Sequence, residues 1–310
     1  AKRTWSTELL EATGLALNSM PRAFEGTEVT GKLRAEVASE WGCDSVQVVA
    51  GAGDQAAGAA GAGVVSPGQA MLSLGTSGVY FVTTDSFRPN PDRAVHAFCH
   101  CLPGTWHQMS VMLSAASCLT WATKLTGSKD EAALLAKVEA SAGRSERLLF
   151  LPYLSGERTP HNDPHATGVL VGIGHETDAA ALGRAVLEGV AFAFAEGQDA
   201  LLAAGGEIDS VSVIGGGSRS KLWGTILASA LERPLIYRKG GEVGPALGAA
   251  RLARIGLSGE APADVCRELP EDFVALPDAA LLDQYSSLRA RFAKLYPALC
   301  ETFRDTGQQD

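Results

Sequence analysis

The sequence predicts an α/β protein, and two of its features carry that prediction. Short apolar runs bounded by glycine alternate with longer stretches in which apolar residues recur every three or four positions. A helical stretch that leads into a buried strand is typical of α/β architecture. The predicted strands lie at 46–49, 70–74, 79–82, 94–101, 105–111, 148–151, 168–173, 211–214 and 235–237.

The composition narrows the possible functions. A chain of 310 residues allows about two domains. Its 26 basic and 35 acidic residues give a net charge of −9, which disfavours a general nucleic-acid or membrane-surface binder but is compatible with a local phosphate site. No apolar run approaches the roughly 20 residues needed to span a bilayer. No signal-peptide core follows Lys2-Arg3.

The six cysteines have no framework spacing, which predicts reduced and buried thiols in a cytoplasmic protein. Cys99-His100-Cys101 is the one local cluster. A single intervening residue is too short for the usual zinc-binding loop, so we favour core packing over a metal site there.

The first 45 residues predict two helices and no strand. The first helix, at 4–15, has three apolar residues on one side: Trp5, Leu9 and Leu10. Thr30 is expected to cap the second helix, in which apolar residues recur every four positions at Leu33, Val37 and Trp41.

Asp54 follows an apolar run that ends in glycines. We expect it at the carboxyl end of a buried strand, where open α/β sheets place ligands. The alternative is that Asp54 caps a helix. Only alanine and glycine occupy 56–63, so the backbone there can approach a neighbour or a substrate closely.

Residues 70–82 predict a hairpin. A turn at 66–68 leads into two strands joined by the tip Gly75-Thr76-Ser77-Gly78. Unencumbered N–H groups and hydroxyls at such a tip suit an anion such as phosphate. The alternative is a tight turn without a ligand.

The middle of the chain predicts further helices and one long loop. A helix at 113–125 places Ser117 and Trp121 on one row, and Ser128 begins a capping box for the next helix, with Glu131. The polar, proline-rich segment 152–165 predicts a loop, of a length that is usually functional or disordered. Glu157-Arg158 is expected to serve the structure of that loop. The prolines around His161 disfavour a helical metal pair with His165.

A glycine tract, Gly215-Gly216-Gly217-Ser218, separates a predicted strand from a helix. Its N–H groups would lie at the positive end of that helix, which favours an anion. Alone it indicates a nucleotide only weakly, because the Walker lysine pattern and the dinucleotide fingerprint are missing. The longest helix, at 178–204, precedes this tract and is expected to be capped by Thr177 or Asp178. Later helices begin at Gly244-Pro245 and include the apolar row of Tyr285, Leu288, Phe292 and Leu295.

The order of these motifs resembles the FGGY family of carbohydrate kinases over about residues 1–305, and within it bacterial xylulokinases most closely. The segments that carry the resemblance are 50–58, 74–78, 215–223 and 240–250. A second signature of the family is similar to Gly168, Leu170, Gly172, Ile173, Leu182, Ala185, Val186, Leu187 and Glu188.

The resemblance implies an actin-like ATPase (ribonuclease H-like) fold with two lobes. Residues 1–63 would be the end of an incomplete amino-terminal sugar-binding lobe, and 64–310 the complete carboxyl-terminal nucleotide-binding lobe. The Asp-x-Gly-Thr hairpin of the first lobe is absent from these residues. We therefore expect the chain to need that lobe for activity.

The implied reaction is ATP-dependent phosphorylation of a sugar hydroxyl, D-xylulose to D-xylulose 5-phosphate. Asp54 would be the general base and, with Gln55, would bind the sugar; it could also face the Mg²⁺ of Mg-ATP. The nucleotide would be bound by Gly75, Thr76, Ser77, Gly215, Gly216, Gly217, Ser218 and Lys221. The alternatives are a kinase for glycerol, ribulose or gluconate, or a nucleotide-binding fragment that is inactive by itself. A homodimer is a common default.

Three residues depart from the family pattern. Gln55 replaces the usual asparagine of xylulokinases, which leaves the fine substrate preference open. Ala181 replaces a polar residue and Glu242 an aspartate.

Overall fold

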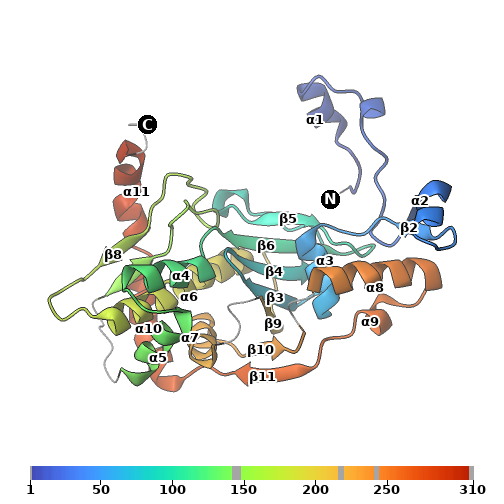
Figure 1. Cartoon of the computed structure of the whole chain (residues 1–310). Coiled ribbons are helices and arrows are strands. Elements are labelled where there is room, and N and C mark those ends of the chain that lie inside the picture. Colours follow the sequence, from blue (N-terminus) through green and yellow to red (C-terminus); the bar gives the residue numbers. More distant parts are fainter. Residues whose placement is uncertain (1, 142–147, 216–219, 241–243, 307–310) are drawn as a thin grey trace.

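A mixed seven-stranded sheet forms the centre of the protein in a computed structural model, which describes residues 2–141, 148–215, 220–240 and 244–306 (Figure 1). The strand order is β11-β10-β9-β3-β4-β6-β5. Their bounds are β3 (Gln69–Leu74), β4 (Gly78–Thr84), β5 (His96–Cys99), β6 (Trp106–Met112), β9 (Ser210–Ile214), β10 (Leu235–Arg238) and β11 (Glu271–Ala275). All but β11 were predicted. The pairs β3–β9 and β9–β10 are parallel, and the other neighbours are antiparallel.

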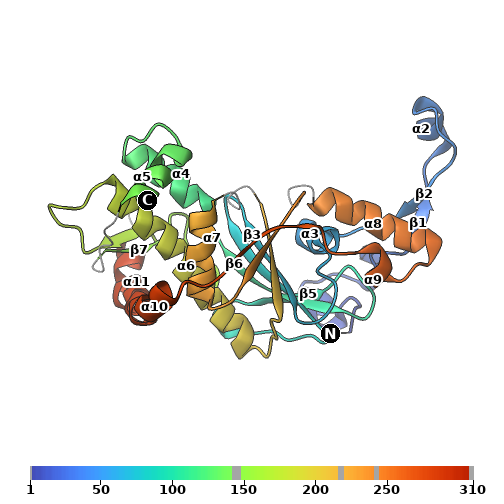
Figure 2. The same ribbon diagram turned by 90° about the horizontal axis from the view of Figure 1, so that it is seen from below.

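Helices cover both faces of the sheet (Figure 2). One face is covered by α6 (Ala179–Ala203) and α7 (Lys221–Leu231). Three further helices pack on these two: α4 (Ala116–Leu125) and α5 (Glu131–Ala140) on α6, and α10 (Ala279–Phe292) on α7. The other face carries α3 (Asp54–Ala62), against which α8 (Gly244–Ser258) packs. Successive strand side chains point to opposite faces, so Leu72 and Tyr80 join one core while Met71 and Phe81 join the other.

The longest helix confirms its prediction. α6 is 25 residues long, its N-cap is Asp178, and most of its side chains are buried. Smaller elements lie outside the two layers: α9 (Pro262–Val265), α11 (Leu295–Thr306), and a two-stranded sheet of β7 (Leu149–Leu151) and β8 (Val169–Val171). Leu295 therefore begins a separate helix instead of extending α10. No helix in the described ranges is both long and apolar enough to cross a membrane.

The amino-terminal arm corrects two predictions. It contains α1 (Thr7–Ala12), β1 (Val29–Lys32), α2 (Ala35–Glu40) and β2 (Gln47–Val49), and in Figure 1 it extends from one side of the layered body, which it contacts where β2 meets α8. Thr30 does not cap a helix: it lies in β1, and its hydroxyl donates to Val48 O. Nor is β2 buried, because it pairs only with β1, which leaves Val46 and Val48 exposed.

Another correction concerns the start of α5. Ser128 was expected to cap this helix through a capping box. The N-cap is Asp130 instead, whose Oδ1 accepts from Ala133 N at 2.8 Å. Aspartate two positions closer to the first turn satisfies the same free N–H groups.

The alanine and glycine tract forms α3, and its small residues allow a close contact with α8. A Cβ placed on Gly61 would lie 1.8 Å from Gly244 O, and one on Gly248 would lie 1.8 Å from Ala57 O. The guanidinium of Arg251 on α8 donates to the carbonyls of Ala60 and Gly61. The predicted close approach is therefore to a neighbouring helix, and it fixes the position of α3 on the sheet.

We expect Gly61→Ala to lower the free energy of unfolding by roughly 1–3 kcal/mol, because the added methyl group overlaps the α8 backbone. Gly58→Ala is the matched control on the same helix, since a Cβ there meets nothing closer than 3.8 Å. It should stabilise the protein by up to about 1 kcal/mol through helix propensity. Denaturant unfolding measures both changes, and equal effects would contradict this view of the α3–α8 contact.

Candidate active site

The hairpin tip and the start of the glycine tract lie side by side at one edge of the sheet. β3 and β9 are parallel neighbours with Ser73 opposite Ile214, so both strands end at the same edge. Gly215 directly follows β9 with φ +99°, and a Cβ on it would lie 2.8 Å from Leu74 O. This is the edge at which open α/β sheets bind ligands. Gly216, Gly217 and Ser218 lie outside the described residues.

The tip itself exposes donors. Its carbonyls turn toward the start of α4, where Ala116 N donates to Gly75 O and Ala115 N to Thr76 O, each at 2.9 Å. The side chains of Thr76 and Ser77 are exposed. Within the part of the chain that the structure describes, the N–H groups of Thr76 and Ser77 donate to no protein oxygen. Two free N–H groups and two hydroxyls together suit an anion.

A pocket of about 680 Å³ adjoins the tip. Five residues of α4 line it together with Gly75 and Thr76: Ala116, Ser117, Thr120, Trp121 and Lys124. The Ser117 hydroxyl also donates to Thr76 O at 2.9 Å. Ser117, Thr120, Trp121 and Lys124 are not among the site residues predicted from the sequence. The signal that could have found them is the polar row of Ser117, Thr120 and Lys124 at helical spacing beside a phosphate-type hairpin.

Lys221 is the first residue of α7 and is exposed. Ser220 caps this helix by accepting from Trp223 N at 3.2 Å. The Lys221 ammonium lies over the ring of Phe273 on β11, 5.7 Å from its centroid. This cation lies at the start of the helix that follows β9, three positions after Ser218 in the sequence.

Asp54 is the first residue of α3, after the N-cap Gly53. Both predictions for Asp54 are therefore corrected: it does not end a buried strand, and it is not the N-cap of the helix. Its carboxylate is exposed and accepts from Gln55 N at 2.8 Å, while the Gln55 amide donates to its second oxygen at 3.4 Å. An exposed carboxylate with acceptor capacity left over can take a proton or hold a cation.

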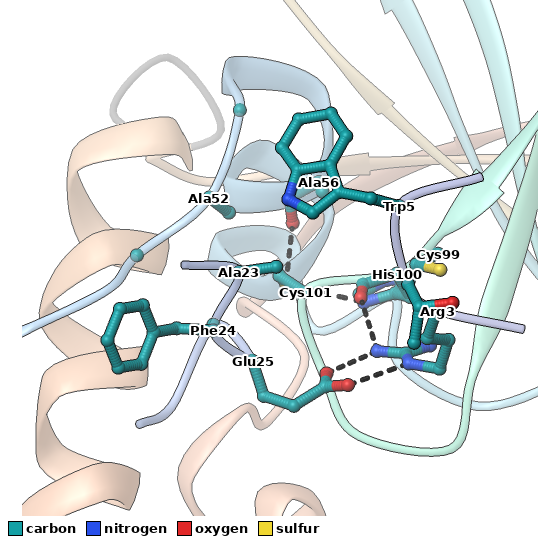
Figure 3. Close-up of a pocket in the computed structure, with 14 residues that line it drawn as sticks. Arg3, Trp5, Ala23, Phe24, Glu25, Ala52, Ala56, Cys99, His100 and Cys101 are labelled. Atoms are coloured by element: carbon teal, nitrogen blue, oxygen red, sulfur yellow. Dashed lines mark hydrogen bonds and ion pairs between the residues drawn. The ribbon is translucent and has the colours of Figure 1, made fainter. Parts of the chain in front are cut away.

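A second pocket, of about 420 Å³, lies beside the segment that leads into α3 (Figure 3). Trp5, Phe24 and Glu25 reach it from the amino-terminal arm. Ala52, just before α3, and Ala56, in its first turn, also line it. Arg3 and Glu25 form an ion pair at its edge. The pocket has aromatic and charged walls, a combination that fits a hydroxylated molecule.

The Cys99–Cys101 segment lines the second pocket as well. Cys101 is buried and its thiol contacts Ala56 O at 3.4 Å, whereas Cys99 is exposed, contrary to the expectation that all thiols are buried. Burial lowers the pKa of His100 to about 4. All six cysteines are free. No group of three or more His, Cys, Asp or Glu side chains that could hold a metal ion occurs in the described ranges.

Comparisons with known proteins identify the family of the chain. Residues 70–257 match the carboxyl-terminal domain, and residues 1–61 the amino-terminal domain, of the FGGY family of carbohydrate kinases. The xylulose kinase of Escherichia coli (strain K12) is 52% identical over 96% of this chain and 62% of its own length. That of Klebsiella pneumoniae is 49% identical over the same shares. The crystal structure titled "xyloylose kinase" from Brucella ovis gives a TM-score of 0.91 at 47% identity, covering 96% of this chain and 62% of its own.

The sheet and its covering helices define an α/β protein of the actin-like ATPase fold. Within that class, the chain belongs to the FGGY family of carbohydrate kinases. It spans 62% of the length of the relatives named above.

Proposed function

We propose that the complete protein transfers the γ-phosphoryl group of ATP to a hydroxyl of D-xylulose, giving ADP and D-xylulose 5-phosphate. Two relatives at 52% and 49% identity are xylulose kinases, which supports this substrate. The observation that carries the proposal is the meeting of the hairpin tip with Gly215 at one sheet edge. It supports a single phosphate site that combines the exposed donors of the tip with the chain that leaves β9 at Gly215.

In the proposed reaction the sugar oxygen forms a bond to the γ-phosphorus while the bond from that phosphorus to the ADP oxygen breaks. The hydroxyl proton passes to the carboxylate of Asp54, whose exposed position leaves it accessible to a substrate. Catalysis of this kind depends mainly on positioning and on neutralising phosphate charge. The contact of α3 with α8 would hold Asp54 in place.

The triphosphate would be bound by Gly75, Thr76 and Ser77 through the tip's free N–H groups and hydroxyls. The pocket along α4 would take the rest of the nucleotide. Lys221 would add a positive charge at the start of α7. Gly216, Gly217 and Ser218 remain proposed nucleotide-binding residues.

Mg²⁺ usually binds to substrate phosphates with one or two carboxylates. The exposed carboxylate of Asp54 fits that pattern as a single protein ligand. The ion, when bound with the nucleotide, supplies charge neutralisation at the phosphate oxygens.

Asp54 and Gln55 would contact the sugar. Their neighbours in the sequence, Gly53 and Ala56, line the pocket shown in Figure 3. We also propose the division into an incomplete sugar-binding lobe, 1–63, and a nucleotide-binding lobe, 64–310. The rest of the sugar-binding lobe would be required for turnover.

Six free thiols support a reducing compartment such as the cytoplasm. A homodimer is the oligomeric state we propose to test.

The test is an assay of ADP release by the complete protein with D-xylulose, ribulose, glycerol and gluconate. We expect the highest kcat/KM for D-xylulose. A higher kcat/KM for another acceptor would refute the proposed substrate, and ADP release that no acceptor stimulates would refute the proposed reaction.

A further inference from the structure

The loop between β7 and β8 contains a buried carboxyl group that the proposed reaction does not use. Glu157 is 2% exposed. Its Oε1 accepts from Leu113 N at 3.0 Å and from Arg158 N at 2.7 Å. Its Oε2 is buried and has no hydrogen-bond partner in the described part of the chain. Burial raises the pKa of this carboxyl to about 8.

Beyond the end of β5, this loop takes the place of β5 as the hydrogen-bonding neighbour of β6. β5 pairs with β6 only as far as His96 opposite Met109. Beyond that point, Val111 N donates to the Thr159 hydroxyl and Thr159 N donates to Val111 O, each at 3.0 Å. Leu113, two residues further, donates to Glu157. Two side chains of the loop thus satisfy alternate N–H groups that have no strand partner.

Leu113 begins the turn that holds the hairpin tip. Two residues later, the N–H groups of Ala115, Ala116 and Ser117 and the Ser117 hydroxyl all donate to the carbonyls of Gly75 and Thr76. These bonds fix the tip's carbonyls against the start of α4, while the Thr76 and Ser77 N–H groups donate to no oxygen of the described residues. A shift of Leu113 would therefore reach the proposed phosphate donors through this short turn.

A contribution to folding stability does not explain why a carboxyl group is buried at Glu157. A buried carboxyl with one oxygen unpaired costs free energy, and Glu196 adds a repulsive charge nearby. Arg158 attracts it, but no ion pair with Glu157 forms in the described residues. Costly buried groups of this kind occur often at functional sites.

We propose that Glu157 is a positioning residue for nucleotide binding, which fixes the 113–117 turn and thereby orients the hairpin tip. This inference rests on the proposed function, because it assigns the tip to the phosphates. The hydrogen bond to Leu113 is the link that it requires.

The test compares three variants of the complete protein: Glu157→Ala, Glu157→Gln and Thr159→Val. Loss of the Leu113 bond in Glu157→Ala should raise the KM for ATP by about 10-fold and leave the KM for the sugar unchanged. Glu157→Gln keeps a side-chain oxygen for Leu113, so it should restore the KM for ATP to within about 3-fold of the unsubstituted protein.

Thr159→Val is the matched control, because it removes a buried hydroxyl of the same loop that bonds Val111 and not the turn. It should lower Tm as Glu157→Ala does while leaving the KM for ATP within about 2-fold. An unchanged KM in Glu157→Ala, or an equal rise in Thr159→Val, would overturn the proposal. If Glu157→Ala does not fold, Glu157→Asp replaces it, since its shorter side chain does not reach Leu113.

Failure of the proposed function would give a different experimental result from failure of the role proposed for Glu157. In that case the unsubstituted protein would phosphorylate no sugar at all. Calorimetric titration of the same variants with ATP would still show whether the affinity falls in Glu157→Ala and recovers in Glu157→Gln, so the role of Glu157 is decided independently.

Discussion

Asp54→Asn in the complete protein should lower kcat for sugar phosphorylation by about 10²- to 10⁴-fold, the range typical of losing a general base. The amide cannot take the hydroxyl proton, yet it keeps an oxygen that can accept from Gln55 N, so the start of α3 should be unaffected. Steady-state kinetics should show a KM for ATP within about 2-fold of the unsubstituted value, because the nucleotide contacts remain.

Asp44→Asn is the control for the loss of one negative charge. Asp44 is also exposed and lies in the amino-terminal arm, before β2. Its substitution should leave kcat and both KM values unchanged. If Asp54→Asn turned over D-xylulose at the unsubstituted rate, the assignment of the base would be wrong.

Gly215→Ala should raise the KM for ATP by about 10- to 100-fold, which corresponds to roughly 1.4–2.8 kcal/mol. Residue 215 has φ +99°, where an L side chain is strained, and its Cβ would lie 2.8 Å from Leu74 O. Relief of that overlap requires β9 or the hairpin tip to move, which separates the two halves of the proposed phosphate site.

Gly205→Ala is the control that distinguishes the effect of backbone strain from the effect of moving β9 or the hairpin tip. Gly205 also has a positive φ, +79°, but it lies between α6 and the start of β9, at the opposite end of that strand. A Cβ there meets only the flexible end of Arg88. Both variants should lose stability in thermal unfolding, while only Gly215→Ala should raise the KM for ATP. Equal KM values would show that Gly215 does not contribute to the site.

The central sheet could be predicted because its signals are local. In β3 and β4, apolar runs end at glycine or polar residues, and the tip between them has turn chemistry. β11 was missed because it is an edge strand that begins with Glu271 and Asp272, so it lacks an apolar run. Thr30 was misassigned because a β-branched hydroxyl residue suits both a cap and a strand, and only the pairing with β2 decides between them.

The individual motifs of the candidate site could be predicted from the sequence, but their proximity in space could not. Each motif gives the residues near a strand end, but only the parallel register of β3 with β9 brings Gly215 beside the hairpin tip. The contribution of α4 depends on the turn at 113–117, whose hydrogen bonds to Thr76 O join residues some 40 positions apart. Such contacts have no local sequence signal.

The most direct measurement is a rapid-quench single turnover of the complete Asp54→Asn protein with ATP already bound and D-xylulose then added. We expect full occupancy by ATP and almost no D-xylulose 5-phosphate on the time scale of the unsubstituted reaction. Formation of the product at the unsubstituted rate would contradict it.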